Sequence, residues 1–165
     1  MDMKDTRRVT IIGMGNLLLT DEGIGVHVAR ALRKMDLPDG VEAIDGGTSP
    51  EISSYIESTE KLIVIDAMET GGIPGSVYRI PIDDLTTEVA GLTSIHEVNL
   101  ISMLKMMRLL DRGPQDTVII GIQPGDMDWG TELSPELQQK IPQIVQIVLK
   151  EIDNREPVPD GISCP

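Results

Sequence analysis

Acidic residues and one histidine occur in this sequence where short apolar runs end or where a helical pattern begins. Asp45 and Asp66 each close an apolar run, Glu22 lies in a glycine-rich stretch after the first run, and His96 opens a later helical pattern. Imidazole and carboxylate groups together suit nickel, zinc or a similar divalent ion. Glu22, Asp66 and His96 are therefore a candidate set of metal ligands.

Each of these acids also has a purely structural interpretation. Asp21, the neighbour of Glu22, could cap a helix that begins near Gly23, and Glu22 could favour the dipole of that helix. Asp45 and Asp66 could be turn formers, a common role of aspartate. Taken together they are harder to explain in this way, because carboxylates crowded at one edge repel each other and a bound cation would relieve that repulsion.

The apolar patterns predict the elements that must position these side chains. Short β-rich runs alternate with segments of helical period, and the link from Asp66 to Ser76 is too short for a helical crossover, which predicts one antiparallel strand. We expect a three-layer α/β domain with a mostly parallel, twisted sheet of about five strands between helices. The expected strands are 9–12, 41–44, 62–65, 76–80 and 118–122, and the expected helices are 23–35, 50–58, 96–110 and one from 134 that contains Pro142.

The predicted order brings the polar residues to one side of the sheet. The four parallel strands end at Gly13, Asp45, Asp66 and Gln123. An open α/β sheet binds its ligands beyond the carboxyl ends of its strands. The spacing therefore predicts a functional site at this edge.

The glycine-rich stretch that follows the first strand bears on a different candidate function, nucleotide binding. After Gly13 and Gly15, a dinucleotide-binding loop requires a third glycine where this chain has Leu18, and no Walker lysine or nucleophile elbow is present. A doubly wound nucleotide-binding oxidoreductase or transferase is therefore disfavoured. The glycines are expected to allow a sharp turn and to leave room for something bulky. His27, the other histidine, is expected to be structural or exposed.

Composition limits the partners and the compartment. The 165 residues carry a formal net charge of -13 and only 2% aromatic residues, which excludes nucleic-acid binding by a basic patch or by base stacking. The sole cysteine, Cys164, cannot form an internal disulfide, and neither a secretory signal nor an apolar run of membrane-spanning length is present. We expect a cytoplasmic protein with one domain over 1–152 and a flexible tail over 153–165.

Five sequence blocks, in order, resemble the hydrogenase maturation endopeptidases. They are Gly13-Met14-Gly15-Asn16-Leu17-Leu18-Leu19-Thr20-Asp21-Glu22-Gly23-Ile24-Gly25, Asp45-Gly46-Gly47-Thr48, Ile65-Asp66-Ala67, Ser94-Ile95-His96-Glu97, and Gly121-Ile122-Gln123-Pro124 followed by Trp129-Gly130. The resemblance extends over about residues 9 to 152. A glycine-rich loop alone would be weak support, but five blocks in the family's order are specific.

The resemblance implies a function and a set of site residues. Members of this family remove the C-terminal extension of a nickel-loaded hydrogenase large-subunit precursor and so activate it. The positions that match the family's nickel ligands are Glu22, Asp66 and His96, and Asp45 matches an important aspartate. We expect nickel to be supplied by the substrate, with another divalent ion able to occupy the site in its absence, and we expect a monomer.

The chemistry of cleavage stays open at this stage. Asp45 or Asp66 could act as the general base of an aspartic-type endopeptidase, or a metal could polarise the scissile carbonyl or activate water. A non-catalytic nickel-binding maturation chaperone on the same scaffold is the alternative function. Trp129 could contact the precursor or could pack locally.

Overall fold

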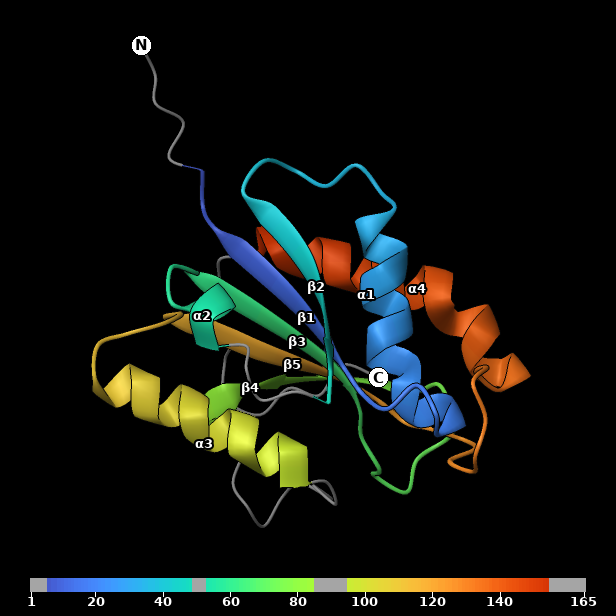
Figure 1. Ribbon diagram of the computed structural model, residues 1–165. Coiled ribbons are helices and arrows are strands. Elements are labelled where there is room, and N and C mark those ends of the chain that lie inside the picture. Colours follow the sequence, from blue (N-terminus) through green and yellow to red (C-terminus); the bar gives the residue numbers. More distant parts are fainter. Residues whose placement is uncertain (1–5, 49–52, 85–94, 155–165) are drawn as a thin grey trace.

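The structure is a computed structural model that describes residues 6–48, 53–84 and 95–154, with side chains of the third range described from Leu100 onward. A five-stranded sheet forms its centre (Figure 1), with the strand order β2-β1-β3-β5-β4. The strands are β1 (Val9–Met14), β2 (Val41–Gly47), β3 (Lys61–Ala67), β4 (Val77–Pro81) and β5 (Asp116–Ile122). The first, second, third and fifth strands run parallel, and β4 pairs antiparallel with β5.

Helices cover both faces of this sheet. The longer helices are α1 (Ile24–Arg33), α3 (Ile95–Leu109) and α4 (Pro135–Asp153), and the shorter ones are η1 (Thr20–Gly23), α2 (Ser53–Ile56) and η2 (Ile82–Asp84). Figure 1 shows α1 and α4 on one face and α2 and α3 on the other. The domain therefore has the three layers that the alternation of patterns predicted.

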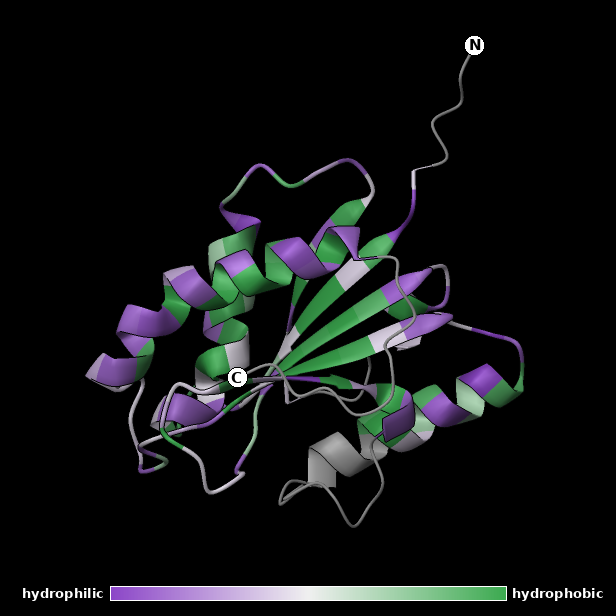
Figure 2. Cartoon of the chain, turned by 180° about the vertical axis from the view of Figure 1, so that it is seen from behind, coloured by the Kyte–Doolittle hydropathy of each residue, from purple (hydrophilic) through white to green (hydrophobic). Residues whose placement is uncertain are grey.

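The central strands are mostly apolar because both of their faces are covered. Every residue of β1 and β3 is buried. Successive side chains of β3 point to opposite faces, so Ile63 and Ile65 join the core under α1 and α4, whereas Leu62 and Val64 join the core under α2 and α3. Figure 2 shows the hydrophobic strands between helices whose outer faces are hydrophilic.

Most of the predicted elements are present, and two differ in detail. The fold class is confirmed, including the antiparallel strand. The helix expected over 50–58 is described only as α2, Ser53–Ile56, and residues 49–52 lie outside the described part. The last helix is continuous through Pro142, so a separate first piece is not formed. No helix in the described ranges is long and apolar enough to cross a membrane.

Candidate functional site at the carboxyl edge of the sheet

The loops that follow the parallel strands gather at one end of the sheet (Figure 1), which we call the carboxyl edge and define as residues 15–23, 45–48, 66–76 and 123–134. Gly13 lies beside Asp45 in β2 and beside Ile65 in β3, in the paired registers of the three strands. Asp66 in turn lies beside Gly121 of β5. The predicted convergence of strand ends is therefore present.

Asp21 holds two of these loops together. Its side chain is fully buried, and its Oδ2 accepts hydrogen bonds from the backbone N–H groups of Gly125 at 2.9 Å and Asp126 at 2.8 Å and from the Ser134 hydroxyl at 2.8 Å. Its Oδ1 accepts a fourth, from the Ser134 N–H, at 2.8 Å. Asp21 does not cap α1, whose N-cap is Gly23. The carboxylate instead fixes the loop after β5 against the loop after β1.

Backbone hydrogen bonds reinforce this contact. Leu19 and Gly130 form a parallel bridge in which the Gly130 N–H donates to the Leu18 carbonyl and the Thr20 N–H donates to the Gly130 carbonyl, both at 2.9 Å. The Thr20 hydroxyl donates to the Asp128 carbonyl at 2.6 Å. The two loops are thus one ordered unit.

The glycines of the first loop serve close packing of the chain, and the expectation that they leave room for something bulky is wrong. A Cβ at Gly15 would lie 2.0 Å from the Glu22 carbonyl oxygen, and a Cβ at Gly13 would lie 2.0 Å from the Gly25 carbonyl oxygen. One at Gly25 would lie 2.2 Å from the Ile65 carbonyl oxygen. Protein backbone fills the space beside these glycines and holds η1 and α1 directly against the ends of β1 and β3.

Glu22 lies within this tightly packed turn. It is part of η1, its side chain is half-buried, and the structure shows no hydrogen bond or ion pair of its carboxylate with the described residues. Because Gly25 abuts the carbonyl of Ile65, η1 is held close to the end of β3 that carries Asp66. Glu22 therefore provides, at the predicted edge, a carboxylate without a partner among the described residues.

Asp66 is nearly buried, with 9% of its surface exposed. Its Oδ1 accepts a hydrogen bond from the Ala67 N–H at 2.8 Å. The alternation along β3 puts Asp66 on the same face as Leu62 and Val64, which is the face that α3 covers. The side chain therefore lies at the carboxyl edge on the α3 side of the sheet.

His96 lies in the first turn of α3, and its side chain lies outside the described residues. The last turn of α3 is at the opposite end of the sheet, because Arg108 and Leu109 line the same hollow as Thr117, near the start of β5. A helix of 15 residues is about 22 Å long, close to the length of about 20 Å of a seven-residue strand. The first turn of α3, which contains His96, therefore lies toward the carboxyl edge.

Asp45 lies at the end of β2, in contact with α1. Its Oδ2 accepts a hydrogen bond from the Arg30 Nε at 2.9 Å, and its Oδ1 accepts one from the Gly47 N–H at 3.1 Å. The bond to Gly47 supports the turn-forming role considered from the sequence. The ion pair with Arg30 is partly exposed, so it contributes about 1 kcal/mol or less to stability.

The predicted metal ligands are not tested by this arrangement. Within the described ranges, no three His, Cys, Asp or Glu side chains form a group that could hold a metal ion. The set of Glu22, Asp66 and His96 depends on the imidazole of His96, which is not described, and so it stays a prediction. Two carboxylates and one imidazole remain a suitable donor set for nickel.

Gln123 is a residue of the carboxyl edge for which no role was predicted. It is 3% exposed, and its Oε1 accepts hydrogen bonds from the Thr70 N–H at 2.7 Å and the Thr70 hydroxyl at 2.8 Å. Its Nε2 donates to Glu69 Oε1 at 2.8 Å. Gln123 thus fixes the loop after β3. The signal available in the sequence was a polar residue directly after the apolar run of the fourth parallel strand.

His27 is half-buried, in agreement with a structural role. Its Nε2 is buried and has no hydrogen-bond partner among the described residues. Burial, and then the positive charge of Arg30, lower the pKa of His27 below its ordinary value of 6.5. The neutral imidazole is therefore favoured in the folded protein.

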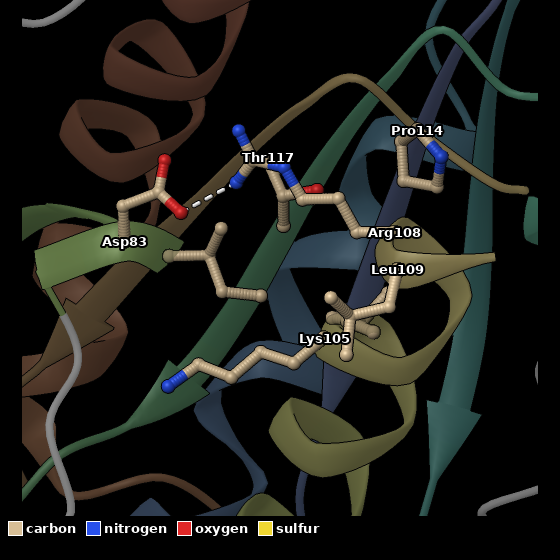
Figure 3. A pocket seen from close by; sticks show the side chains of 8 residues that line it. Asp83, Lys105, Arg108, Leu109, Pro114 and Thr117 are labelled. Carbon is tan, nitrogen blue, oxygen red and sulfur yellow. Dashed lines mark hydrogen bonds and ion pairs between the residues drawn. The ribbon is translucent and has the colours of Figure 1, made fainter. Parts of the chain in front are cut away.

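A separate hollow of about 490 Å³ lies away from the carboxyl edge. Figure 3 shows Asp83 and Arg108 paired across it, with Leu109 and Thr117 in its wall. Because Thr117 lies near the start of β5, this hollow is at the other end of the sheet from Asp66.

The chain is similar to proteins of one family over most of its length. A family model described as hydrogenase maturation protease matches residues 26–151, a segment that begins after Glu22. The hydrogenase expression/formation protein HupD of Bradyrhizobium diazoefficiens is 35% identical over 138 residues, which cover 81% of this chain and 72% of that protein. The hydrogenase 2 maturation protease of Escherichia coli is 30% identical over 145 residues, covering 86% of this chain and 88% of that protein.

Solved structures show the same likeness. The hydrogenase maturating endopeptidase HybD from Escherichia coli superposes with a TM-score of 0.78 at 30% identity, covering 88% of this chain and 91% of that chain. The hydrogenase 2 maturation peptidase from a Thaumarchaeota archaeon has a TM-score of 0.69 at 31% identity, covering 88% and 98%. The likeness includes the mixed five-stranded sheet with its single antiparallel strand.

Proposed function

This chain belongs to the hydrogenase maturation protease family and is a peptidase, and we propose that it removes the C-terminal extension of a nickel-loaded hydrogenase large-subunit precursor. The observation that carries the proposal is the carboxylate of Glu22, which has no partner in the described part of the chain and is held by the packed glycines close to the end of β3 that bears Asp66. The names of the relatives as proteases argue against the alternative of a non-catalytic chaperone. The reaction would take place in the cytoplasm, with the enzyme acting as a monomer.

Glu22, Asp66 and His96 would contact nickel that the precursor carries. Three ligands from the enzyme leave coordination positions for the substrate's own groups, which a metal delivered by a partner requires. In this role nickel belongs to the substrate, and its presence reports that the precursor's metal centre is assembled. Another divalent ion could occupy the same ligands when nickel is absent.

Asp45 would act as the general base that activates water for hydrolysis, with Asp66 as the second candidate for this role. A carboxylate can accept the proton of the attacking water, and such general-base catalysis contributes about 100-fold to 10,000-fold to rate. Arg30 and the Gly47 N–H hold the Asp45 carboxylate in one orientation. This assignment makes the enzyme an aspartic-type endopeptidase.

Two readouts separate the ligand role from the base role. Binding of nickel-loaded precursor would be measured by light-scattering-coupled chromatography, and cleavage by intact mass. We expect Glu22→Gln to lose the difference in binding between loaded and nickel-free precursor. We expect Asp45→Asn to keep that difference while cleaving at least about 100-fold more slowly.

Glu42→Gln is the matched control, since Glu42 is an exposed acid on the same strand as Asp45. It should behave as wild type in both assays. Full cleavage by Asp45→Asn would eliminate Asp45 as the base, and an unchanged nickel dependence of binding in Glu22→Gln would eliminate Glu22 as a ligand.

A further inference from the structure

Three exposed apolar side chains lie on the two joined loops of the carboxyl edge. Leu18 is 54% exposed, Met127 is 41% exposed and Trp129 is 83% exposed. Trp129 is the only tryptophan of a chain that has no phenylalanine. Its exposure argues against the local packing role that the sequence left open. We call these three residues the apolar patch.

The register of the loops puts members of the patch side by side. The parallel bridge between Leu19 and Gly130 aligns Leu18 with Trp129, the preceding residue on each strand of the bridge. Residues aligned in a parallel pair direct their side chains to the same face. Met127 lies two residues before Trp129 on the same loop. The patch is therefore a surface assembled from two segments that are far apart in the sequence.

The loops that carry this surface are ordered. Asp21 accepts four hydrogen bonds from Gly125, Asp126 and Ser134, and Thr20 bonds to the carbonyl of Asp128 next to Trp129. Because the large aromatic side chain of Trp129 is exposed to water, its burial does not stabilise the free protein. Exposed apolar side chains in such a setting mark protein interaction sites, and tryptophan is enriched among the residues that dominate binding energy.

The surroundings of the patch are acidic. Residues 123–136 contain no lysine or arginine. Their four acidic residues are all exposed, namely Asp126, Asp128, Glu132 and Glu136. A partner segment that complements both features would present an apolar side chain flanked by lysine or arginine. A second copy of this chain would instead bring two acidic rims together.

We propose that Leu18, Met127 and Trp129 form the docking surface for the hydrogenase precursor, which they engage through an apolar segment flanked by basic residues. This inference rests on the proposed function for the identity of the partner. The loop that carries Trp129 is linked to the proposed nickel site, because Asp21, which anchors this loop, is the sequence neighbour of Glu22. Docking on the patch would bring the precursor directly to the carboxyl edge.

The single tryptophan provides a direct test. The protein would be produced with 5-fluorotryptophan, so that Trp129 gives its only fluorine NMR signal, and unlabelled precursor would be added. We expect the signal to shift and broaden as the precursor covers Trp129. An unchanged signal in a mixture shown to be bound by sedimentation would overturn the proposal.

Variants extend the test to affinity. Trp129→Ser should weaken precursor binding by about 10-fold to 30-fold, and Leu18→Ser should weaken it by a smaller factor. Leu109→Ser is the matched control, because Leu109 is an 87% exposed apolar residue at the other end of the sheet. Asp128→Asn combined with Glu132→Gln should slow association and reduce its dependence on salt concentration.

The outcomes distinguish this proposal from the proposed function. Binding that depends on Trp129 but is not followed by cleavage would overturn the peptidase reaction on that precursor and support the docking surface. Cleavage with equal KM for wild type, Trp129→Ser and Leu109→Ser would overturn the docking surface alone. Loss of a homodimer in Trp129→Ser, with unchanged precursor affinity, would assign the patch to self-association and would also overturn the proposal.

Discussion

Buried charges are paired with opposite charges at the amino edge of the sheet, whereas at the carboxyl edge the fully buried carboxylate is held by neutral hydrogen-bond donors. We define the amino edge by the ion-paired residues Arg7, Lys61, Arg79, Asp116 and Glu151. Asp21 is the corresponding buried charge of the carboxyl edge.

Lys61 is the centre of the amino edge. Its ammonium group is fully buried at the start of β3 and donates to Glu151 Oε1 and to the Asn154 carbonyl, both at 2.9 Å. Arg79 forms two further hydrogen bonds to the Glu151 carboxylate, at 2.6 and 2.7 Å. Asp116 Oδ2 lies 3.3 Å from the Lys61 ammonium. These bonds tie the last turn of α4 to the sheet.

This difference between the two edges indicates that the charges of the amino edge serve stability, whereas those of the carboxyl edge serve function. Acids at the amino edge are compensated by cations of the same chain. At the carboxyl edge, N–H and hydroxyl donors stabilise Asp21 and bring no positive charge, and Glu22 next to it has no partner among the described residues. Asp45 is the exception, since it pairs with Arg30. We propose that the acids of this edge attract a cation that comes from outside, namely the nickel of the precursor.

The largest effect on stability is expected at the amino edge. Glu151→Gln should lower the free energy of unfolding by about 3 kcal/mol, because it leaves the buried Lys61 without its nearest carboxylate. Urea denaturation measures this loss. Below the melting temperature, cleavage per folded molecule should be unchanged.

Asp153→Asn is the control for this change, since Asp153 is an exposed acid on the same helix. A loss of cleavage in folded Glu151→Gln would show that the two edges are coupled and would break the division between them.

A smaller loss is expected at the carboxyl edge. Asp21→Asn should lower the free energy of unfolding by about 2 kcal/mol, because an amide nitrogen would face backbone N–H donors that now bond to a charged carboxylate. It should also weaken precursor binding, since the loop of Trp129 loses its anchor. Asp128→Asn, at an exposed acid of the same loop, should leave stability within about 0.5 kcal/mol of wild type. Wild-type stability in Asp21→Asn together with loss of cleavage would point to a catalytic role.

Lowering the pH should weaken the ion pairs that Glu151 forms at the amino edge. Burial by itself would raise the pKa of Glu151, but the hydrogen bonds and charges of Arg79 and Lys61 outweigh it and lower that pKa below its ordinary value of 4.5. A lowered carboxyl pKa contributes stability that is present above the ordinary value and is lost as pH falls through the lowered one. The urea midpoint of wild type should therefore fall more steeply below about pH 4.5 than that of Glu151→Gln. If the urea midpoints of wild type and Glu151→Gln fell in parallel with pH, the titration of Glu151 would not explain the loss of stability in acid.

The smallest effect belongs to His27. Its folded-state pKa is lowered by burial and by Arg30, so the unfolded chain binds the proton more readily and stability falls as pH drops below the ordinary value of 6.5. His27→Leu should remove this component and change stability by no more than about 1 kcal/mol at neutral pH, because Nε2 has no hydrogen-bond partner among the described residues. Identical pH curves between about pH 7 and pH 5.5 for wild type and His27→Leu would contradict this.

The strands and the site edge could be predicted because local patterns determine them. The run Leu62-Ile63-Val64-Ile65 is apolar because both faces of β3 are covered, and the short link after Asp66 required the antiparallel strand. The position of Asp66 at a strand end followed from the same pattern.

Contacts between distant segments could not be predicted in this way. Asp21 bonds to Ser134, 113 residues away, and Lys61 bonds to Glu151, 90 residues away, so neither role is visible in a local pattern. The glycines of the first loop were wrongly expected to make room, because the chain segments that fill the space, at Glu22, Gly25 and Ile65, meet only in the fold.

We propose that the carboxyl edge contacts the nickel of the precursor before cleavage. The most direct measurement incubates the protein with nickel-loaded and nickel-free hydrogenase large-subunit precursor and follows both by intact mass. We expect loss of a C-terminal peptide from the loaded precursor only, and no such loss with Glu22→Gln. Equal cleavage of loaded and nickel-free precursor, or full activity of Glu22→Gln, would contradict it.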